Sequence, residues 1–191
     1  MGVNYDDYYQ TENLFGDPYP ELVRFFTRLE TRGKVLDLGC GQGRDSIALA
    51  RMGYYVTGVD HSEVGIRQLN KIAQQHELSL KGLVADIYEY QDFGEFDVIL
   101  LDSMFHFAKG DKEKELGLLE SIINEAKGEA MIVICIQDSG KKMQIFEAAI
   151  SGRTDLEMIH REGLIYRFED QTSNHHSESK YEMVAMKKLR A

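Results

Sequence analysis

The sequence predicts an α/β fold, in which helices cover a mostly parallel sheet. Between residues 33 and 150, short apolar runs typical of buried parallel strands alternate with stretches of helical spacing. After residue 152 the helical spacing stops, and three strand-like segments follow at 156–160, 164–168 and 181–187. We expect these to be strands that close the sheet.

The simplest organisation is one domain spanning residues 1–191, because the chain has the length of a single domain and contains no repeat, low-complexity tract or linker. Residues 1–30 would form an N-terminal aromatic segment and a helix. Residues 33–150 would form the α/β core, and residues 151–191 the closing strands.

Apolar spacing predicts the helices of this fold. One helix begins near Pro20, and Ser62 is placed to cap another that continues to residue 73. Residues 111–126 carry an apolar stripe with charged side chains on the opposite side, and residues 145–150 mark one more helix.

One stretch changes character sharply and suggests a ligand site. An apolar strand at 35–38 leads into three alternating glycines, Gly39, Gly41 and Gly43, and a helix follows directly. Glycines at such positions let the backbone turn tightly and bring a ligand close to bare peptide groups near a helix N-terminus. The stretch therefore indicates a nucleotide-type binding loop.

The residues around this loop argue against a dinucleotide. The G-x-G-x-x-G/A fingerprint requires a small residue at position 44, where this chain has Arg44. Asp37 would repel a pyrophosphate, yet a carboxylate suits a ligand with an ammonium and a sulfonium group. An NAD-dependent oxidoreductase therefore stays only as an alternative.

The string VLDLGCGQG at 35–43 resembles motif I of the class I S-adenosylmethionine-dependent methyltransferases. GCGQGRDSIALA, followed by GYYV at 53–56 and Val59-Asp60, is similar to the small tellurite-resistance and thiopurine methyltransferase branch. The resemblance implies a Rossmann-like fold with a seven-stranded, mostly parallel sheet and helices on both faces. It also implies that the closing strands are antiparallel and that the last one is inserted back into the sheet. The expected cofactor is S-adenosyl-L-methionine (SAM), and the expected reaction is methyl transfer to a small molecule such as a thiol, an amine or a metalloid oxyanion. A SAM-binding regulatory module without transfer activity is the other alternative.

The cofactor residues expected from this resemblance include those of the first strand and the loop: Asp37, Gly39, Cys40, Gly41 and Gly43. Asp60 ends the second strand about 20 residues after the first glycine, where a carboxylate can accept hydrogen bonds from ribose hydroxyls. We include its neighbour His61. A capping role for Asp60 is the weaker interpretation, because Ser62 can already cap the following helix.

Asp86 and Ile87 follow the third strand and resemble the adenine site of the family. The carboxylate would accept from the exocyclic amine, and the apolar side chain would pack on the ring. The competing interpretation is an exposed aspartate in a turn.

Three further residues are candidates for the methyl-transfer site. Asp102 ends the fourth strand, and the segment DSMFHF at 102–107 matches in position the segment that lines this site in the family. Asp102 would face the sulfonium or amino group of the cofactor, and His106 would act as a general base. Alternatively, His106 is a structural histidine between two phenylalanines.

His176 is the third candidate, because related enzymes carry a histidine in a similar loop. It lies in the polar stretch 171–180, for which an exposed loop is the alternative interpretation. Adjacent histidines at 175 and 176 point apart in an extended chain, so we expect no metal site.

Tyrosines and acidic residues are interleaved near the N-terminus. The string YYQTENLFGDPYPEL at 8–22 is similar to a segment that lies across the cofactor in small methyltransferases, so the resemblance implies that residues 4–16 form a lid. The alternative is that these aromatics only cover a hydrophobic seam. Deleting this segment would distinguish the two.

Composition limits the partners. The net charge of −10 disfavours a nucleic-acid substrate, because nucleic-acid affinity depends largely on cationic contacts with phosphates. Two cysteines do not make a disulfide framework, and no signal peptide or membrane-spanning run is recognisable, so we expect a cytoplasmic protein. The chain would be a monomer or a homodimer.

Overall fold

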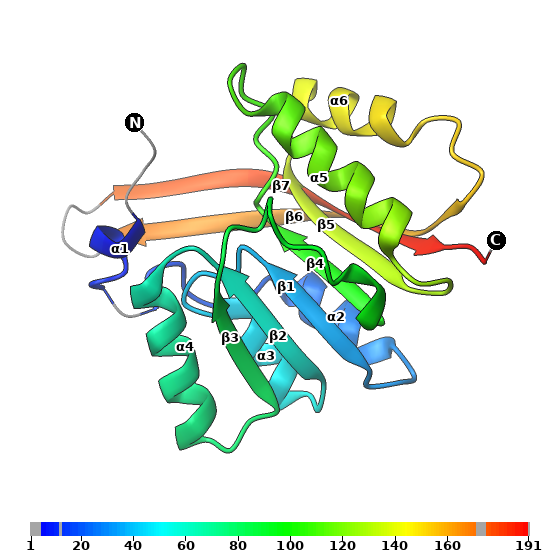
Figure 1. Cartoon of the computed structure of the whole chain (residues 1–191). Helices are drawn as coiled ribbons and strands as arrows, with labels where there is room; N and C mark the ends of the chain where they lie inside the picture. The colour runs from blue at the N-terminus through cyan, green and yellow to red at the C-terminus, as the bar shows by residue number, and fades with distance from the viewer. Residues whose placement is uncertain (1–4, 12, 171–174, 191) are drawn as a thin grey trace. The chain divides into compact units, whose positions relative to one another are not determined.

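The computed structural model describes residues 5–11, 13–170 and 175–190 (Figure 1). Strands and helices alternate through most of the chain, as the spacing of apolar residues predicts. The elements are α1 (Tyr5–Tyr8), α2 (Pro20–Arg28), β1 (Lys34–Leu38), α3 (Arg44–Arg51), β2 (Tyr55–Asp60), α4 (Glu63–Gln75), β3 (Leu80–Val84), η1 (Phe93–Glu95), β4 (Val98–Asp102), α5 (Lys112–Glu125), β5 (Met131–Gln137), α6 (Lys141–Ile150), β6 (Leu156–Asp170) and β7 (His175–Lys188).

The strands form a seven-stranded sheet in the order β3-β2-β1-β4-β5-β7-β6. β1 pairs with β2, β2 with β3 and β4 with β5 in parallel, whereas β7 runs antiparallel to both β5 and β6. The predicted mostly parallel sheet is therefore confirmed, and so is the insertion of the last strand between its neighbours. The chain divides into two compact units, residues 1–90 and 91–191.

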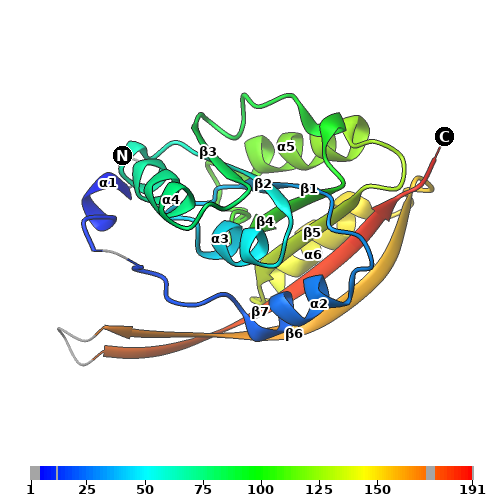
Figure 2. The ribbon, with the colours of Figure 1, turned by 90° about the horizontal axis from the view of Figure 1, so that it is seen from below.

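The first unit is built on β1, β2 and β3. Helices α2, α3 and α4 lie on one side of these strands (Figure 2). Every residue of β1 after Lys34 is buried, which explains why Val35, Leu36 and Leu38 are apolar, and the charged Asp37 is buried among them. Ser62 caps α4 as predicted, because its side chain accepts a hydrogen bond from the backbone N–H of Gly65 at 3.0 Å.

The second unit has its core around β4 and β5. All five residues of β4 are buried, and the five central residues of β5 are buried as well. β7 continues this core, because Met183, Val184, Ala185 and Met186 are all buried. Helix α6 packs against β5.

The closing region differs from the prediction in two respects. The segments expected at 156–160 and 164–168 belong to one strand, β6, which continues through the polar residues Arg161 and Glu162 with a register shift between Met158 and His160. Polar residues and a bulge are normal in an edge strand, so they do not mark a turn here. The loop expected at 171–180 is also corrected, because β7 begins at His175 and residues 175–180 belong to that strand.

β6 and β7 pair over most of their length and form a long two-stranded ribbon (Figure 2). None of the helices in the described part of the chain is long and apolar enough to cross a membrane.

Helix α2 is attached to the start of the β2 segment through Tyr54. Phe26 and Tyr54 are fully buried, and their rings meet edge to face at 5.5 Å between centroids. The Tyr54 hydroxyl donates a hydrogen bond to the carbonyl of Phe26 at 2.8 Å. This single contact joins residues 28 positions apart in the sequence.

We expect Tyr54→Phe to lower the free energy of unfolding by about 1 to 2 kcal/mol, because it leaves the buried Phe26 carbonyl without this donor. Urea unfolding followed by circular dichroism measures the change. Tyr55→Phe is the matched control, since the Tyr55 side chain is 62% exposed. Equal stability of the two variants would contradict a contribution from the Tyr54 hydroxyl.

Candidate functional site

The glycine loop adopts the conformation that its sequence requires. Gly39, Gly41 and Gly43 all have positive φ, at 77°, 54° and 89°. Residues with a side chain rarely adopt this left-handed region, so glycine is the residue suited to all three positions. The loop joins the end of β1 to the start of α3, as predicted.

The backbone N–H groups of this loop are largely bonded within the protein. The N–H groups of Gly39 and Cys40 donate to the carbonyl of Val59 at 2.8 and 3.1 Å. The N–H of Gly41 donates to Asp60 Oδ2 at 2.9 Å, and the N–H of Gly43 to the Cys40 carbonyl at 2.8 Å. A phosphate-binding loop offers such N–H groups to its ligand, so this loop is poorly suited to a pyrophosphate.

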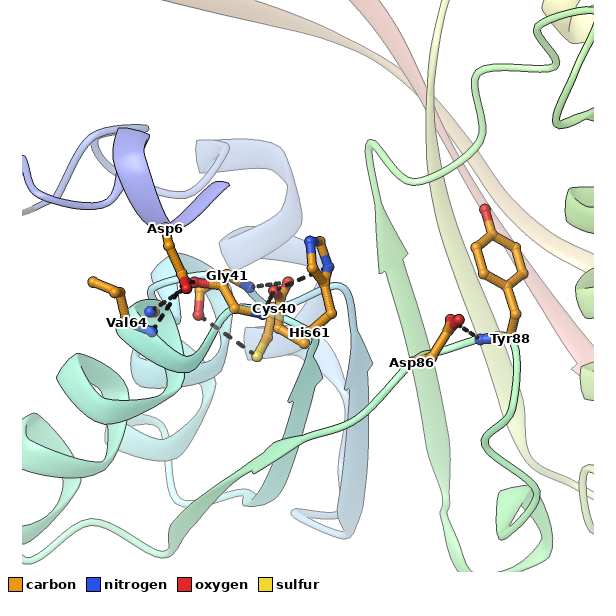
Figure 3. Close-up of polar contacts among 10 residues, drawn as sticks. Asp6, Cys40, Gly41, His61, Val64, Asp86 and Tyr88 are labelled. Atoms are coloured by element: carbon orange, nitrogen blue, oxygen red, sulfur yellow. Dashed lines mark hydrogen bonds and ion pairs between the residues drawn. The ribbon is translucent and has the colours of Figure 1, made fainter. Parts of the chain in front are cut away.

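Asp60 fixes the geometry at the end of β2. Its side chain is buried, and besides Gly41 it accepts a hydrogen bond from the Ser62 N–H at Oδ1, at 2.8 Å. A carboxylate has about four acceptor positions, so two N–H donors leave capacity for the hydroxyls of a ribose. His61 is 63% exposed, and its Nδ1 lies 3.7 Å from Asp60 Oδ1 (Figure 3).

Asp37 and Cys40 lie in the interior beside the loop. Asp37 is 2% exposed and accepts a hydrogen bond from Ser46 Oγ at 2.5 Å, which connects β1 to the first turn of α3. Burial raises the pKa of the Cys40 thiol well above its usual value, and the charges of Asp37 and Asp60 raise it further. Cys40 is therefore a neutral thiol at physiological pH, and its sulfur packs against Gly58.

The N-terminal segment lies on the glycine loop and on α4. Tyr9 is 4% exposed, and its hydroxyl occupies the space in front of Gly41: a Cβ at Gly41 would lie 2.4 Å from Tyr9 Oη. Asp6 accepts hydrogen bonds from Ser62 Oγ and from the N–H of Val64 at the start of α4 (Figure 3). These two bonds lower the pKa of the Asp6 carboxyl.

Gln42 strengthens this attachment, and sequence reasoning missed it. Its Nε2 donates to the Thr11 carbonyl at 2.8 Å and to Gln68 Oε1 at 2.7 Å, while its Oε1 accepts from the Leu14 N–H at 2.9 Å. Gln68 Nε2 in turn donates to the Tyr9 carbonyl at 2.8 Å. The described residues of the predicted lid thus cover the loop, and its opening and closing stay a prediction.

Asp86 and Ile87 have different surroundings. Asp86 is exposed, and its Oδ1 accepts from the Tyr88 N–H at 2.9 Å, as in a turn. Figure 3 shows this pair apart from the residues around Gly41. Ile87 is buried. The adenine role of Asp86 and Ile87 stays a prediction. Asp86 has the exposed, turn-like conformation of the competing interpretation.

In the second unit, Asp102 and His106 lie at and after the end of β4. Asp102 is 9% exposed and accepts a hydrogen bond from Ser103 Oγ at 2.8 Å. His106 is exposed, and Phe105 and Phe107 on either side of it are buried and stacked, with 5.5 Å between ring centroids. The side chain of His176 lies outside the described residues. Its role and those of Asp102 and His106 stay predictions.

Glu115 is a second residue that the sequence analysis missed. Charged residues of 111–126 were expected opposite the apolar stripe, but Glu115 is 1% exposed. It lies one turn before Leu118 and Leu119 on the buried face of α5, and this spacing was the available signal. No group of three or more metal-ligating side chains occurs in the part of the chain that the structure describes.

Comparison with known sequences relates this chain to methyltransferases. The profile of the family described as "Tellurite resistance protein TehB" matches residues 1–139. A probable S-adenosyl-L-methionine-dependent methyltransferase TehB of Haemophilus influenzae (strain 10810) is 38% identical over 79 residues. That match covers 41% of this chain and 28% of the relative, so the chain matches less than a third of that protein's length.

Solved structures share the fold. A protein studied for the conversion of a disulfide bond into a thioacetal group during echinomycin biosynthesis superposes with a TM-score of 0.77 and 20% identity, over 97% of this chain and 92% of that one. TehB from Haemophilus influenzae superposes with a TM-score of 0.69 and 20% identity, over 96% of this chain and 65% of that one. At these identities the likeness supports the fold alone.

We expect Gly41→Ala to detach the N-terminal segment, because the new methyl group would collide with Tyr9. The amides of residues 5–11 should exchange with deuterium about tenfold faster, as read by mass spectrometry. Gly140→Ala is the matched control: its φ is also positive, at 65°, but a Cβ there meets nothing within 4 Å. Equal exchange in both variants would show that the Tyr9 contact does not hold the segment in place.

Proposed function

Because the chain belongs to the family of the tellurite resistance protein TehB, we propose that it is a SAM-dependent methyltransferase acting on a small-molecule acceptor. One observation carries the proposal. Three alternating glycines with positive φ follow β1, which carries Asp37. The N–H of the central glycine, Gly41, donates a hydrogen bond to the carboxylate of Asp60 at the end of β2. This arrangement suits a nucleoside without phosphates better than a dinucleotide.

The residues of the first unit fit such a ligand. The buried carboxylate of Asp60 retains acceptor capacity for ribose hydroxyls, and Asp37 and Asp60 add negative charge near a loop that would hold a cation. The positive φ of Gly39, Gly41 and Gly43 gives the loop its tight turn between β1 and α3. We assign cofactor binding to these residues, together with Cys40, His61, Asp86, Ile87 and Asp102.

When bound, SAM supplies a methyl group on a sulfonium that is already reactive. The protein then has mainly to hold the acceptor in line and exclude water, for which well-oriented pairs gain roughly 7 to 11 kcal/mol. The N-terminal segment, with Tyr9 buried over the loop, is suited to water exclusion. A base such as His106 is needed only where the acceptor must lose a proton as it attacks.

We assign the acceptor to the small thiols, amines and metalloid oxyanions. The net charge of −10 disfavours a nucleic acid, and the family description refers to tellurite. Asp102, His106 and His176 are the proposed residues on the acceptor side. Both cysteines are free and buried, which agrees with a reducing cytoplasm.

The first experiment is a thermal-shift titration with SAM, S-adenosylhomocysteine and NAD. We expect stabilisation by the first two, because a ligand that binds only the folded state raises its stability. Transfer from methyl-labelled SAM is then measured with an aryl thiol, an aryl amine, selenite and tellurite. Stabilisation by NAD alone would overturn the proposal, and tight SAM binding without transfer to any acceptor would favour a regulatory module.

Asp60→Ala should weaken SAM binding by about 1 to 3 kcal/mol, the usual range for a lost hydrogen bond to a charged group. Isothermal titration calorimetry measures this difference. Asp60→Asn, which keeps one acceptor oxygen for the Gly41 N–H, should fall between the wild type and Asp60→Ala. Unchanged affinity in both variants would remove Asp60 from the cofactor site.

A further inference from the structure

Glu115 is a buried carboxylate on an otherwise apolar helix face. It is 1% exposed and lies near Leu118, Leu119 and Ile122, which are buried as well. Burying a charge is costly unless hydrogen bonds compensate, so its partners are informative about why it is there.

The partners of Glu115 are two consecutive backbone N–H groups of the segment that follows β4. The His106 N–H donates to Oε1 and Oε2 at 3.2 and 3.1 Å, and the Phe107 N–H donates to Oε2 at 2.6 Å. Hydrogen bonds to an ionised acceptor are roughly twice as strong as neutral ones. The carboxylate of α5 therefore clamps the backbone of residues 106 and 107.

The clamped segment has an unusual backbone conformation. Ser103 and Phe107 have positive φ, at 61° and 49°, although neither is glycine. Such residues are a small minority in proteins, and they persist only where the surroundings enforce them. Hydrogen bonds hold both residues at positive φ. The N–H of Ser103 donates to the Cys135 carbonyl at 3.0 Å, and the N–H of Phe107 donates to Glu115.

This conformation determines which side chains of the segment are buried and which is exposed. Phe105 and Phe107 turn inward and stack with an interplanar angle of 17°, while His106 between them faces solvent. Without the clamp, Phe107 could relax to negative φ, and the direction of His106 would change with it. The orientation of His106 thus depends on a side chain that holds only its backbone.

We propose that Glu115 is the positioning residue of the acceptor side: it holds residues 103–107 in the strained conformation that presents His106 at the carboxyl end of β4. The role rests on the proposed function, because it assigns this segment to the acceptor. Open α/β sheets place their ligand sites outside the carboxyl ends of their strands, which is where β4 ends in Asp102.

Glu115→Gln tests the role against Glu113→Gln. Both residues lie in the first turn of α5, and both changes remove one negative charge, but Glu113 is exposed. A glutamine in place of Glu115 retains one acceptor oxygen and the shape of the side chain, which favours folding. Three quantities are measured: amide exchange at His106 and Phe107 by NMR, the Kd for SAM, and steady-state turnover with the best acceptor among the aryl thiol, aryl amine, selenite and tellurite.

In Glu115→Gln we expect about tenfold faster amide exchange at both positions and a kcat about tenfold lower, as for loss of one charged hydrogen bond. The Kd and KM for SAM should stay within about twofold of the wild type, and Glu113→Gln should match the wild type within about twofold in every quantity. A kcat that falls while SAM binding does not is the signature of positioning, because general destabilisation would lower both.

Two results would overturn the role of Glu115 alone: faster exchange with unchanged kcat, or a kcat, SAM affinity and melting temperature that all fall together. Equal effects of Glu115→Gln and Glu113→Gln would also overturn it, since they would reflect charge and not the clamp. The wild-type protein tests the proposed function separately. If it methylates none of the four acceptors, whether or not it binds SAM, the proposed function fails and this role fails with it.

Discussion

The hydrogen bonds of Asp60 are the contacts on which the candidate cofactor site depends. One carboxylate connects three pieces of chain: the loop after β1 through the Gly41 N–H, the end of β2 on which it sits, and the start of α4 through the Ser62 N–H. The left-handed turn at Gly41 and the capped start of α4 are thereby fixed relative to each other. Ser62 in turn receives Asp6, so the N-terminal segment is attached to the same point.

The same device occurs in both compact units. In each of them a carboxylate that is almost completely removed from water accepts two backbone N–H groups: Gly41 and Ser62 for Asp60, His106 and Phe107 for Glu115. Such a carboxylate fixes a loop more stringently than apolar packing does, because hydrogen bonds are directional and leaving a buried charge unpaired is costly. Both loops follow a parallel strand at its carboxyl end, the edge where α/β proteins place their ligands.

Local patterns made much of the fold predictable. The glycine loop, the buried strands and the Ser62 cap each depend on residues close together in the sequence, and all three were found as expected. The polar stretch at Arg161 and Glu162 misled the prediction, because polarity marks both turns and edge strands. Only the pairing with β7 distinguishes the two, and that pairing is not local.

The contacts that complete the site were beyond sequence reasoning for a related reason. Asp6 meets Val64 across 58 positions, and Gln42 meets Thr11 across 31. Periodicity says which side of a helix is apolar, but it does not say which carboxylate finds a partner inside the protein. Glu115 shows this limit, since its charge suggested solvent although its position on α5 suggested the core.

The placement of β7 has a consequence for how the molecule is made. β5 pairs with β7 along Met131–Gln137, and β7 is the strand that joins β6 to the rest of the described sheet. On the ribosome, this side of β5 therefore stays unpaired until the C-terminal residues have emerged. Until then, the exposed edge of this very apolar strand must be kept from aggregating. In a protein truncated before residue 181, the edge of β5 would stay without its partner strand β7.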